Sequence, residues 1–591
     1  MSHKGIAASP GIVIGRALLL DRDDLTIPKH EIKEEDLPKE IARFEDALIK
    51  TRKEMIEMQT RIEDKMGTKH AEIFDAHLLV LEDRMLIEEV IRRLEKEKRC
   101  VEFVFYESLQ KFAKAFSSIE DEYLKERAAD IQDVGRRVLR NLLGKHHETL
   151  SSIEEKGIVI AYDLAPSETV FINKSFVLGF ATDIGSRTSH TAIIARSLEI
   201  PAIVGLEDIT QRVEYGDTII LDGIHGIIEI NPNEKLIAHY REEIKKFEEI
   251  TRNLSVFQTL PAVTTDDHKL KLMANIELPS ESDSALIHGA VGIGLYRTEF
   301  FYMNRTDLPT EQEHYENYKI VADKMYPHEV VVRTMDLGGD KFLSHLNVPN
   351  ELNPFMGWRA IRFSLEKKDI FKTQLRAILR ANEHGNLKIL YPLITNLEEL
   401  IQANLVLEVV KKELIADGHT INTDIGVGAM IEVPSAALIT DLLAPHVDFF
   451  SIGTNDLIQY ALAVDRVNEH IAYLYDPAHP GVLRFIDKII RDAKDANIRV
   501  AMCGEMASDP IYIPLLIGMG LEEFSVPSAF ISEIKKVSRS ISRTECQKLW
   551  SQVQKISTGK EIQKILVEFL RLKVPELLLY NSFHGGELDS T

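Results

Sequence analysis

A histidine beside an arginine and several hydroxyl side chains is the most concentrated chemical signal in the chain. It is His190, in the segment TDIGSRTSHTAIIARSLE, where we expect a strand to end near Gly185 and a helix to begin near Ser189. The unpaired N–H groups and the positive dipole of a helix N-terminus favour an anion and disfavour an imidazolium. His190 is therefore expected to be neutral and nucleophilic, with Arg187 suited to a phosphate. The plainer alternative is that Ser189 caps the helix and His190 merely follows it.

Three arginines end apolar runs further along the chain. They are Arg297 in GLYRTEF, Arg333 in VVRTMDLGGDK and Arg359 in NPFMGWRAIR. A planar guanidinium matches the oxygens of carboxylate and phosphate groups. A cluster of the three would suit an anion that carries both groups.

Two carboxylates and a thiol follow later apolar runs. Glu432 in MIEVP and Asp456 in IGTNDL offer hard oxygen ligands, which suit Mg²⁺ better than a softer metal. Asn455 precedes Asp456, Arg466 follows in AVDR, and Cys503 in AMCGEMA could serve as an acid. Singly, such residues more often form surface ion pairs or, for a lone cysteine, fill a core. Their joint position at the ends of apolar runs is what favours a site.

Eight such runs after about residue 265 predict how these side chains converge. The runs are KLMANIELP, VGIGLYRTEF, VVVRTMDLGGDK, LKILYPLI, IGVGAMIEVP, FFSIGTNDL, RVAMCGEMA and LEEFSVPS. Amphipathic stretches separate most of them, and alternating strands and helices of this number predict a (β/α)₈ barrel. Barrels of this kind carry their chemistry at the C-terminal ends of the strands, where the polar residues fall.

The first part of the chain has a different texture. Residues 1–21 are rich in Val, Ile and Leu, and strand-like runs return between residues 146 and 230. Helical periodicity fills the interval, as in IARFEDALIKTRKEMIEMQTRIEDK. We therefore expect one α/β domain interrupted by a helical bundle, with the charged segment 233–256 as a connecting helix.

Composition excludes several classes of protein. A net charge of −22 disfavours nucleic acid and anionic membranes as partners. No apolar run is long enough to span a bilayer, and Arg16 splits the first apolar stretch, which argues against a signal peptide. Three cysteines cannot form a disulfide framework, which suits the cytoplasm.

At these motifs the sequence closely resembles Enzyme I of the bacterial phosphoenolpyruvate:sugar phosphotransferase system. The resemblance covers residues 1–575 and includes ASPGIVIGRALLL, DEYLKERAADIQDVG, PSETV, GSRTSHTAIIARSLEIPAIVG, RTMDLGGDK and MCGEMA in the order of the family. One departure is Ile184, where a second glycine would be expected before Ser186. The polar tail beyond about residue 580 has no counterpart.

The resemblance implies a role for each candidate residue. His190 would accept the phosphoryl group, Thr169 would orient its ring, and Cys503 would protonate the enolate of pyruvate. Phosphoenolpyruvate would be bound by Arg297, Arg333, Arg359, Asn455 and Arg466. Mg²⁺ would be held by Glu432 and Asp456. The helical bundle would dock the carrier protein HPr, with His77, Asp83 and Arg127 as contacts, and the barrel would form a homodimer.

These expectations define a multidomain α/β protein. A swivelling phosphohistidine α/β domain with an inserted helical bundle would be followed by a C-terminal barrel, since one histidine must reach both the barrel and HPr. The expected boundaries are 1–21 with 146–230 for the α/β domain, 22–145 for the bundle, 231–262 for the linker helix, 263–575 for the barrel and 576–591 for the tail.

Three alternatives remain at this stage. A dikinase shares the phosphohistidine and barrel domains, but it would need a nucleotide-binding domain for which the chain has no segment. The nitrogen-regulatory form of Enzyme I usually carries a sensor domain before the ASPG opening, whereas the present sequence begins directly with that opening. A catalytically silent regulatory scaffold would have lost some of the residues that are present here.

Overall fold

A computed structural model describes most of the chain. The described residues are 2–20, 27–66, 81, 84–117, 134–135, 137–143, 155–162, 164, 176–185, 192, 195, 200–302, 308–337, 351, 353–466, 468, 470–575 and 577. The chain forms two compact units that divide between Phe247 and Glu248. Among the described helices, none combines the length and the apolar character that crossing a membrane requires.

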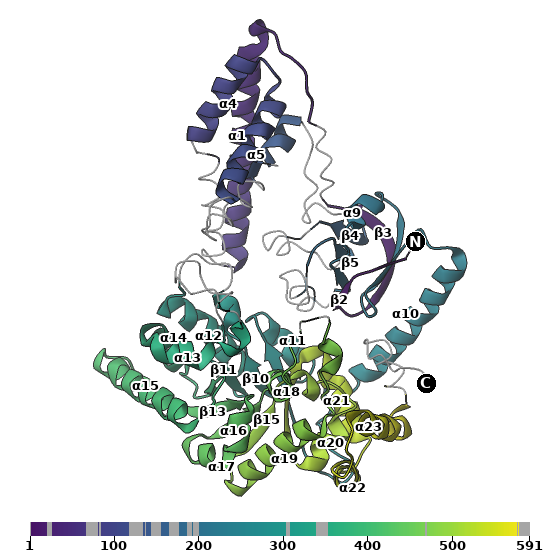
Figure 1. The fold of residues 1–591 in the computed structure, drawn as a ribbon, viewed down its shortest axis with the longest axis vertical. Helices are drawn as coiled ribbons and strands as arrows, with labels where there is room; N and C mark the ends of the chain where they lie inside the picture. Colours follow the sequence, from purple (N-terminus) through teal and green to yellow (C-terminus); the bar gives the residue numbers. More distant parts are fainter. Residues whose placement is uncertain are drawn as a thin grey trace. The chain divides into compact units, whose positions relative to one another are not determined.

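The first unit contains an eight-stranded sheet built from two separate stretches of chain (Figure 1). Its strands are β1 (Ser2–Lys4), β2 (Ile6–Ser9), β3 (Ile12–Leu19), β4 (Gly157–Ala161), β5 (Val177–Thr182), β6 (Ala202–Val204), β7 (Thr218–Asp222) and β8 (Ile227–Ile230). The order is β1-β8-β7-β3-β4-β5-β6-β2, with β3, β4, β5 and β6 parallel. The interrupted α/β domain expected from the sequence is therefore confirmed.

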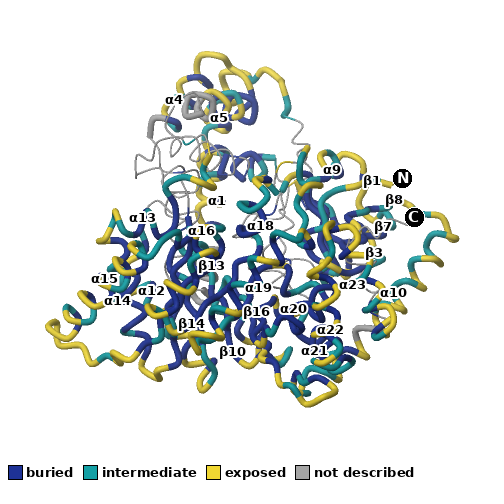
Figure 2. Tube along the Cα trace, turned by 60° about the horizontal axis from the view of Figure 1, so that its bottom comes forward, coloured by how far each residue is buried: buried dark blue, intermediate teal, exposed yellow. Residues whose placement is uncertain are grey.

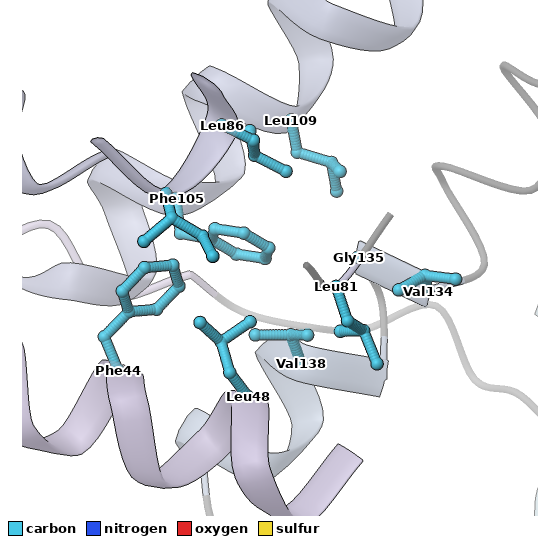
Figure 3. Close-up of a pocket in the computed structure, with 10 residues that line it drawn as sticks. Phe44, Leu48, Leu81, Leu86, Phe105, Leu109, Val134, Gly135 and Val138 are labelled. Carbon is cyan, nitrogen blue, oxygen red and sulfur yellow. The ribbon is translucent and has the colours of Figure 1, made fainter. Parts of the chain in front are cut away.

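The helices between these two stretches form a bundle. It contains α1 (Leu37–Met66), α4 (Arg84–Glu97), α5 (Val101–Ser117) and the helical residues 137–143. Phe44, Val90 and Phe105 lie in its core because apolar residues recur every three or four positions along each helix. A small apolar pocket between the helices is lined by leucine, valine and phenylalanine side chains (Figure 3). It belongs to this core, and the described residues that line it are all apolar or glycine.

The charged segment after the sheet is helix α10 (Glu234–Ser255). Its apolar residues Leu236, Ile237 and Tyr240 pack with Ile12 and Ile220 of the sheet. The sequence suggested a connecting element rather than part of a core. The structure differs for the first half of the helix, because its apolar stripe covers one face of the sheet.

The second unit is built on a closed barrel of eight parallel strands. They are β9 (Lys271–Ile276), β10 (Gly292–Tyr296), β11 (Glu329–Arg333), β12 (Leu387–Tyr391), β13 (Gly426–Ile431), β14 (Phe449–Ile452), β15 (Arg499–Met502) and β16 (Glu523–Pro527). Seven of them lie within an apolar run of the sequence, and β11 begins one residue before its run, at Glu329. The predicted (β/α)₈ barrel is therefore confirmed.

Helices surround this barrel (Figure 2). They are α11 (Glu281–Ile287), α12 (Glu311–Met325), α13 (Ala360–Glu366), α14 (Lys368–Ala381), α15 (Leu397–Ala416), α16 (Pro434–Leu438), α17 (Thr440–Leu443), α18 (Thr454–Leu462), α19 (Pro480–Asp495), α20 (Ile513–Met519), α21 (Ile531–Arg539), α22 (Arg543–Val553) and α23 (Gly559–Lys573). Leu295, Val331, Leu390, Met430 and Phe449 cluster with Cys503. Since these residues lie on or directly after different strands of a closed barrel, they fill its interior.

The N-terminal ends of the strands carry ion pairs. Glu329 lies 2.8 Å from Lys388 and 3.0 Å from Arg499, and Lys271 lies 2.9 Å from Glu523. Charges at this end of a barrel contribute to stability rather than to chemistry.

Candidate active site

The candidate residues of the second unit gather at the C-terminal ends of the barrel strands. Arg297 follows β10 directly, Arg333 is the last residue of β11, Glu432 follows β13 and Cys503 follows β15. Asp456 lies in the first turn of α18, which begins two residues after β14. Because all strands of the barrel are parallel, these ends meet on one rim.

Arg333 and Arg359 share one buried carboxylate. Asp336, which comes three residues after Arg333, lies 3.0 Å from Arg333 Nη1 and 2.7 Å from Arg359 Nη2. Burial alone would raise the pKa of the Asp336 carboxyl, but the charges of the two guanidinium groups outweigh it and lower that pKa. Asp336 therefore stays ionised and holds both arginines in fixed positions.

Further carboxylates neutralise the other guanidinium groups. Glu277 lies 2.7 Å from Arg297, and Glu299 pairs with Arg333. Burial lowers the pKa of the Arg333 guanidinium, yet Glu299 and Asp336 more than reverse this and raise it. The Arg333 guanidinium thus stays charged at physiological pH.

Two guanidinium N–H groups on this rim are not paired within the described residues. Nε of Arg333 and Nη1 of Arg466 are buried, and neither makes a hydrogen bond. Such donors are costly to leave unsatisfied, so they favour an anionic ligand that would accept from them. Their presence supports a site for an anion at the barrel mouth.

The carboxylates Glu432 and Asp456 lie on the same rim. Asp456 is 3.3 Å from Arg359 Nη2 and 3.8 Å from Arg466 Nη2. Glu432 Oε1 accepts a hydrogen bond from the Leu393 N–H at 2.6 Å. Burial, followed by the charges of Asp456 and Asp336, raises the pKa of Glu432 to about 8. A cation at this position would offset the repulsion from Asp456 and Asp336.

The donor set around Glu432 fits a divalent cation in part. Gly453 leaves space beside Glu432, because a Cβ there would lie 2.7 Å from Oε2. No cluster of three or more acidic, histidine or cysteine side chains is arranged to hold a metal in the part of the chain that is described. Two carboxylates suit Mg²⁺, which usually takes its other ligands from water and substrate oxygens.

Asn455 and Cys503 are held by hydrogen bonds. Asn455 donates to the Glu505 carboxylate at 3.1 Å and accepts from the Glu505 N–H at 2.8 Å. The Cys503 thiol is buried, and its Sγ accepts from Ser451 Oγ at 3.3 Å. Burial raises the pKa of this thiol, so it carries its proton near neutral pH.

Sequence reasoning missed the residues that position the arginines. The motifs predict no role for Glu277, Glu299, Asp336 or Tyr460, although Asp336 lies in RTMDLGGDK, the motif that contains Arg333. Tyr460 Oη accepts from Arg359 at 3.3 Å and donates to the Phe355 carbonyl. The signal for Asp336 was its spacing of three residues from Arg333 at a strand end.

Five candidate residues lie outside the described residues: His190, Thr169, His77, Asp83 and Arg127. The described chain before the His190 segment ends at Gly185, which has a φ of 132° that only glycine adopts readily. Asp183 accepts a hydrogen bond from the Thr210 N–H at 3.0 Å, which fixes the end of β5 against α9 (Ile209–Arg212).

Family models match three parts of the chain. The model described as "PEP-utilising enzyme, PEP-binding domain" matches residues 251–543. Those described as "PEP-utilising enzyme, N-terminal" and "PEP-utilising enzyme, mobile domain" match residues 4–127 and 153–226. Together with the barrel site, these matches define the class of the chain as a phosphoenolpyruvate-utilising enzyme.

Curated relatives narrow the class. The chain is 44% identical to the phosphoenolpyruvate-protein phosphotransferase of Priestia megaterium, over 96% of this chain and 98% of that one. It is 45% identical to the protein of the same name from Geobacillus stearothermophilus, over 94% and 96%. For that of Staphylococcus carnosus (strain TM300) the identity is 43%, over 96% and 99%. The chain belongs to the phosphoenolpyruvate-protein phosphotransferase family, which confirms the resemblance seen in the sequence.

Proposed function

We propose that this enzyme is the general phosphotransferase of a sugar phosphotransferase system. It takes the phosphoryl group of phosphoenolpyruvate onto His190, releases pyruvate, and passes the group to the histidine of HPr. The observation that carries the proposal is the set of charged arginines with unpaired N–H donors at the barrel mouth. Such a set matches a small ligand with both carboxylate and phosphate. Membership of the family supplies the reaction.

The arginines and Asn455 bind the substrate in this proposal. Arg297, Arg333 and Arg466 take its carboxylate and phosphate oxygens, and Arg359 faces the transferring phosphoryl group. The ion pairs with Glu277, Glu299 and Asp336 keep these side chains in position before the substrate arrives. Catalysis of phosphoryl transfer is mainly positioning and stabilisation of charge, so preorganised guanidinium groups are suited to it.

Glu432 and Asp456 hold Mg²⁺ in the same proposal. Enzymes of this class are generally metal-dependent. When bound, the ion would neutralise charge on the phosphoryl and enolate oxygens. Support comes from the hard oxygen ligands and from the position of Glu432, whose pKa is raised by burial and by the nearby carboxylates of Asp456 and Asp336.

Cys503 completes the reaction. When the P–O bond between phosphorus and the enol oxygen of phosphoenolpyruvate breaks and the phosphoryl group goes to His190, the enolate of pyruvate needs a proton on its methylene carbon. The S–H bond of Cys503 breaks, a C–H bond forms from the enolate electron pair, and sulfur keeps its own pair as a thiolate. A thiol that burial keeps protonated is suited to give that proton.

The domain roles follow from the same reaction. The α/β domain (1–21 and 146–230) carries His190, with Thr169 orienting its ring, and swivels on the linker (231–262) between the barrel (263–575) and HPr. The inserted bundle (22–145) docks HPr through His77, Asp83 and Arg127, and the tail (576–591) has no assigned part. A cross-link between the α/β domain and the barrel should allow phosphorylation of His190 and stop transfer to HPr; undiminished transfer contradicts the swivel.

The barrel unit also supports a homodimer. Helix α15 is apolar on both sides: Leu400 and Leu407 are buried, while Ile401, Leu405 and Val409 are exposed. The exposed three recur at intervals of four residues and so form one stripe. Leu438 and Leu442 are exposed on the neighbouring helices α16 and α17. An apolar surface of this kind favours burial against a second copy of the chain.

A cytoplasmic location suits the three cysteines, which are all free.

The first experiment is phosphorylation with radiolabelled phosphoenolpyruvate and Mg²⁺. Wild type is expected to take up label and to lose it when HPr is added, whereas His190→Ala should take up none. His239→Ala is a matched control, because His239 is an exposed histidine of the same unit. Failure of the wild type to take up label would contradict the proposal and favour a silent scaffold. Label on His190→Ala would contradict the choice of nucleophile.

A further inference from the structure

The inner face of the barrel places a buried hydroxyl directly against the Cys503 thiol. Ser451 is the third residue of β14, and its Oγ lies 3.3 Å from Cys503 Sγ. β14 and β15 are neighbouring parallel strands with Ser451 opposite Ala501. Since side chains alternate along a strand, Ala501 and Cys503 point to the same side, which brings Ser451 beneath the thiol.

The contacts of the thiol fix the direction of its hydrogen bonds. Cys503 Sγ also lies 3.7 Å from the Ile452 carbonyl oxygen, which can only accept. The thiol can donate only weakly to that carbonyl at this distance, whereas the Ser451 hydroxyl donates to sulfur. Ser451 is 1% exposed, so no water competes for the hydroxyl.

The backbone of Cys503 is held as well. Asn275 Nδ2 donates to the Cys503 carbonyl at 3.1 Å, and Ser525 Oγ donates to Asn275 Oδ1 at 2.6 Å. Both Asn275 and Ser525 come from strands on the far side of Cys503 from β14. The backbone of Cys503 is thus held independently of Ser451, whose hydroxyl donates to the sulfur.

We propose that Ser451 is a positioning residue for the proton transfer, with its hydroxyl orienting the Cys503 thiol and supporting the thiolate left when the proton goes to the enolate carbon. This inference rests on the proposed role of Cys503. A hydroxyl that donates to sulfur binds a full negative charge more strongly than a neutral thiol. It therefore favours the state formed after proton transfer, and the thiolate later takes a proton from water, which leaves hydroxide to the solvent.

Other charges also face the thiol and act on its titration. Arg333 from β11 and Arg297 from the end of β10 favour the thiolate, whereas Glu432 from the end of β13 opposes it. None of these groups changes when Ser451 loses its hydroxyl. A comparison of variants at residue 451 therefore isolates the contribution of the hydrogen bond.

The test is a titration of Cys503 by thiolate absorbance at about 240 nm in the full-length protein, with the Cys503→Ser spectrum subtracted. In Ser451→Ala the midpoint should rise by on the order of one pH unit, as expected for one lost hydrogen bond to a charged group. Ser451→Thr keeps a hydroxyl and should restore the wild-type midpoint. Ser364→Ala is the matched control, because Ser364 Oγ is buried in the same unit and makes no hydrogen bond with the described residues.

Kinetics provide a second readout. Ser451→Ala should lower kcat for phosphoryl transfer to HPr about tenfold and leave KM for phosphoenolpyruvate within about twofold. An unchanged midpoint in Ser451→Ala, or a change in KM alone, overturns the inference. Full activity of Cys503→Ser would instead overturn the proposed role of Cys503, whatever the titration shows. If loss of native tryptophan fluorescence shows that Ser451→Ala does not fold, Ser451→Gly, which also lacks the hydroxyl, is used for the same titration and kinetic measurements.

Discussion

Gln374 of α14 connects the ends of the two strands that carry Arg297 and Arg333. Its Oε1 accepts from the Met335 N–H at 2.9 Å. Its Nε2 donates to Thr298 Oγ1 at 3.1 Å and to Tyr318 Oη at 3.0 Å. Replacing it by leucine keeps the volume and removes all three hydrogen bonds.

The cost can be worked from these contacts. Met335 is buried, so its N–H is left without a partner, which costs about 1–3 kcal/mol. The two lost donations cost about 0.5–1.5 kcal/mol each, because Thr298 Oγ1 still donates to the Arg333 carbonyl and Tyr318 still contacts His314. Burial of leucine returns about 1 kcal/mol. We expect a net loss of about 3 kcal/mol in the free energy of unfolding of the barrel unit.

Urea denaturation followed by tryptophan fluorescence measures this loss selectively. The chain has two tryptophans, Trp358 and Trp550, and both lie in the second unit. With an m-value of about 3 kcal/mol per M, the midpoint should fall by about 1 M. Gln547→Leu, at an exposed position of α22, is the control and should stay within about 0.2 M of wild type. A Gln374→Leu midpoint equal to that of the control would refute the reasoning.

Three further predictions concern the base, the outside and the mouth of the barrel. Burial raises the pKa of Glu329, but the charges of Lys388 and Arg499 outweigh burial and lower that pKa below 4.5. The ionised Glu329 therefore stabilises the fold above pH 4.5, and this stabilisation is lost as the pH falls. Glu329→Gln should cost roughly 2 kcal/mol in the free energy of unfolding at pH 7 and flatten the dependence of the urea midpoint on acid pH. Leu405→Glu should shift sedimentation from dimer to monomer at micromolar concentration, and a dimer of unchanged affinity would exclude α15 as the interface. Glu432→Gln should abolish phosphorylation at millimolar Mg²⁺ concentrations. With Mg²⁺ removed by a chelator at pH 8, the free energy of unfolding should not fall, because the amide replaces a carboxylate whose charge is disfavoured by burial. Phosphorylation of the variant at the wild-type rate would exclude Glu432 as a metal ligand.

The positions of the candidate residues on the barrel could be predicted because strand boundaries are local. An apolar run of a few residues followed by polar ones identifies the end of a strand, and parallel strands bring their ends to one rim. Arg297, Glu432 and Cys503 each follow such a run directly. The location of these residues at the C-terminal rim of the barrel could therefore be predicted without knowing how the helices pack on the strands.

Contacts between distant segments could not be predicted in the same way. Asp336 binds Arg333, three residues away, but also Arg359, and Arg359 in turn contacts Asp456. Which carboxylate meets which guanidinium depends on loop conformations after each strand, and these have no periodic pattern. Gln374 is one polar position on an amphipathic helix, and its burial among three polar partners follows from how α14 packs on the barrel.

The sequence by itself determined the order of the elements, the interrupted α/β domain, the eight strands and the residue types at their ends, because these depend on side-chain periodicity and on local turn chemistry. Tertiary structure alone decided the electrostatics and the pairing. The pKa of Glu432 rises to about 8 because closure of the barrel removes water and brings Asp456 and Asp336 near. Likewise, Ser451 meets Cys503 across 52 residues only because β14 and β15 pair in one register.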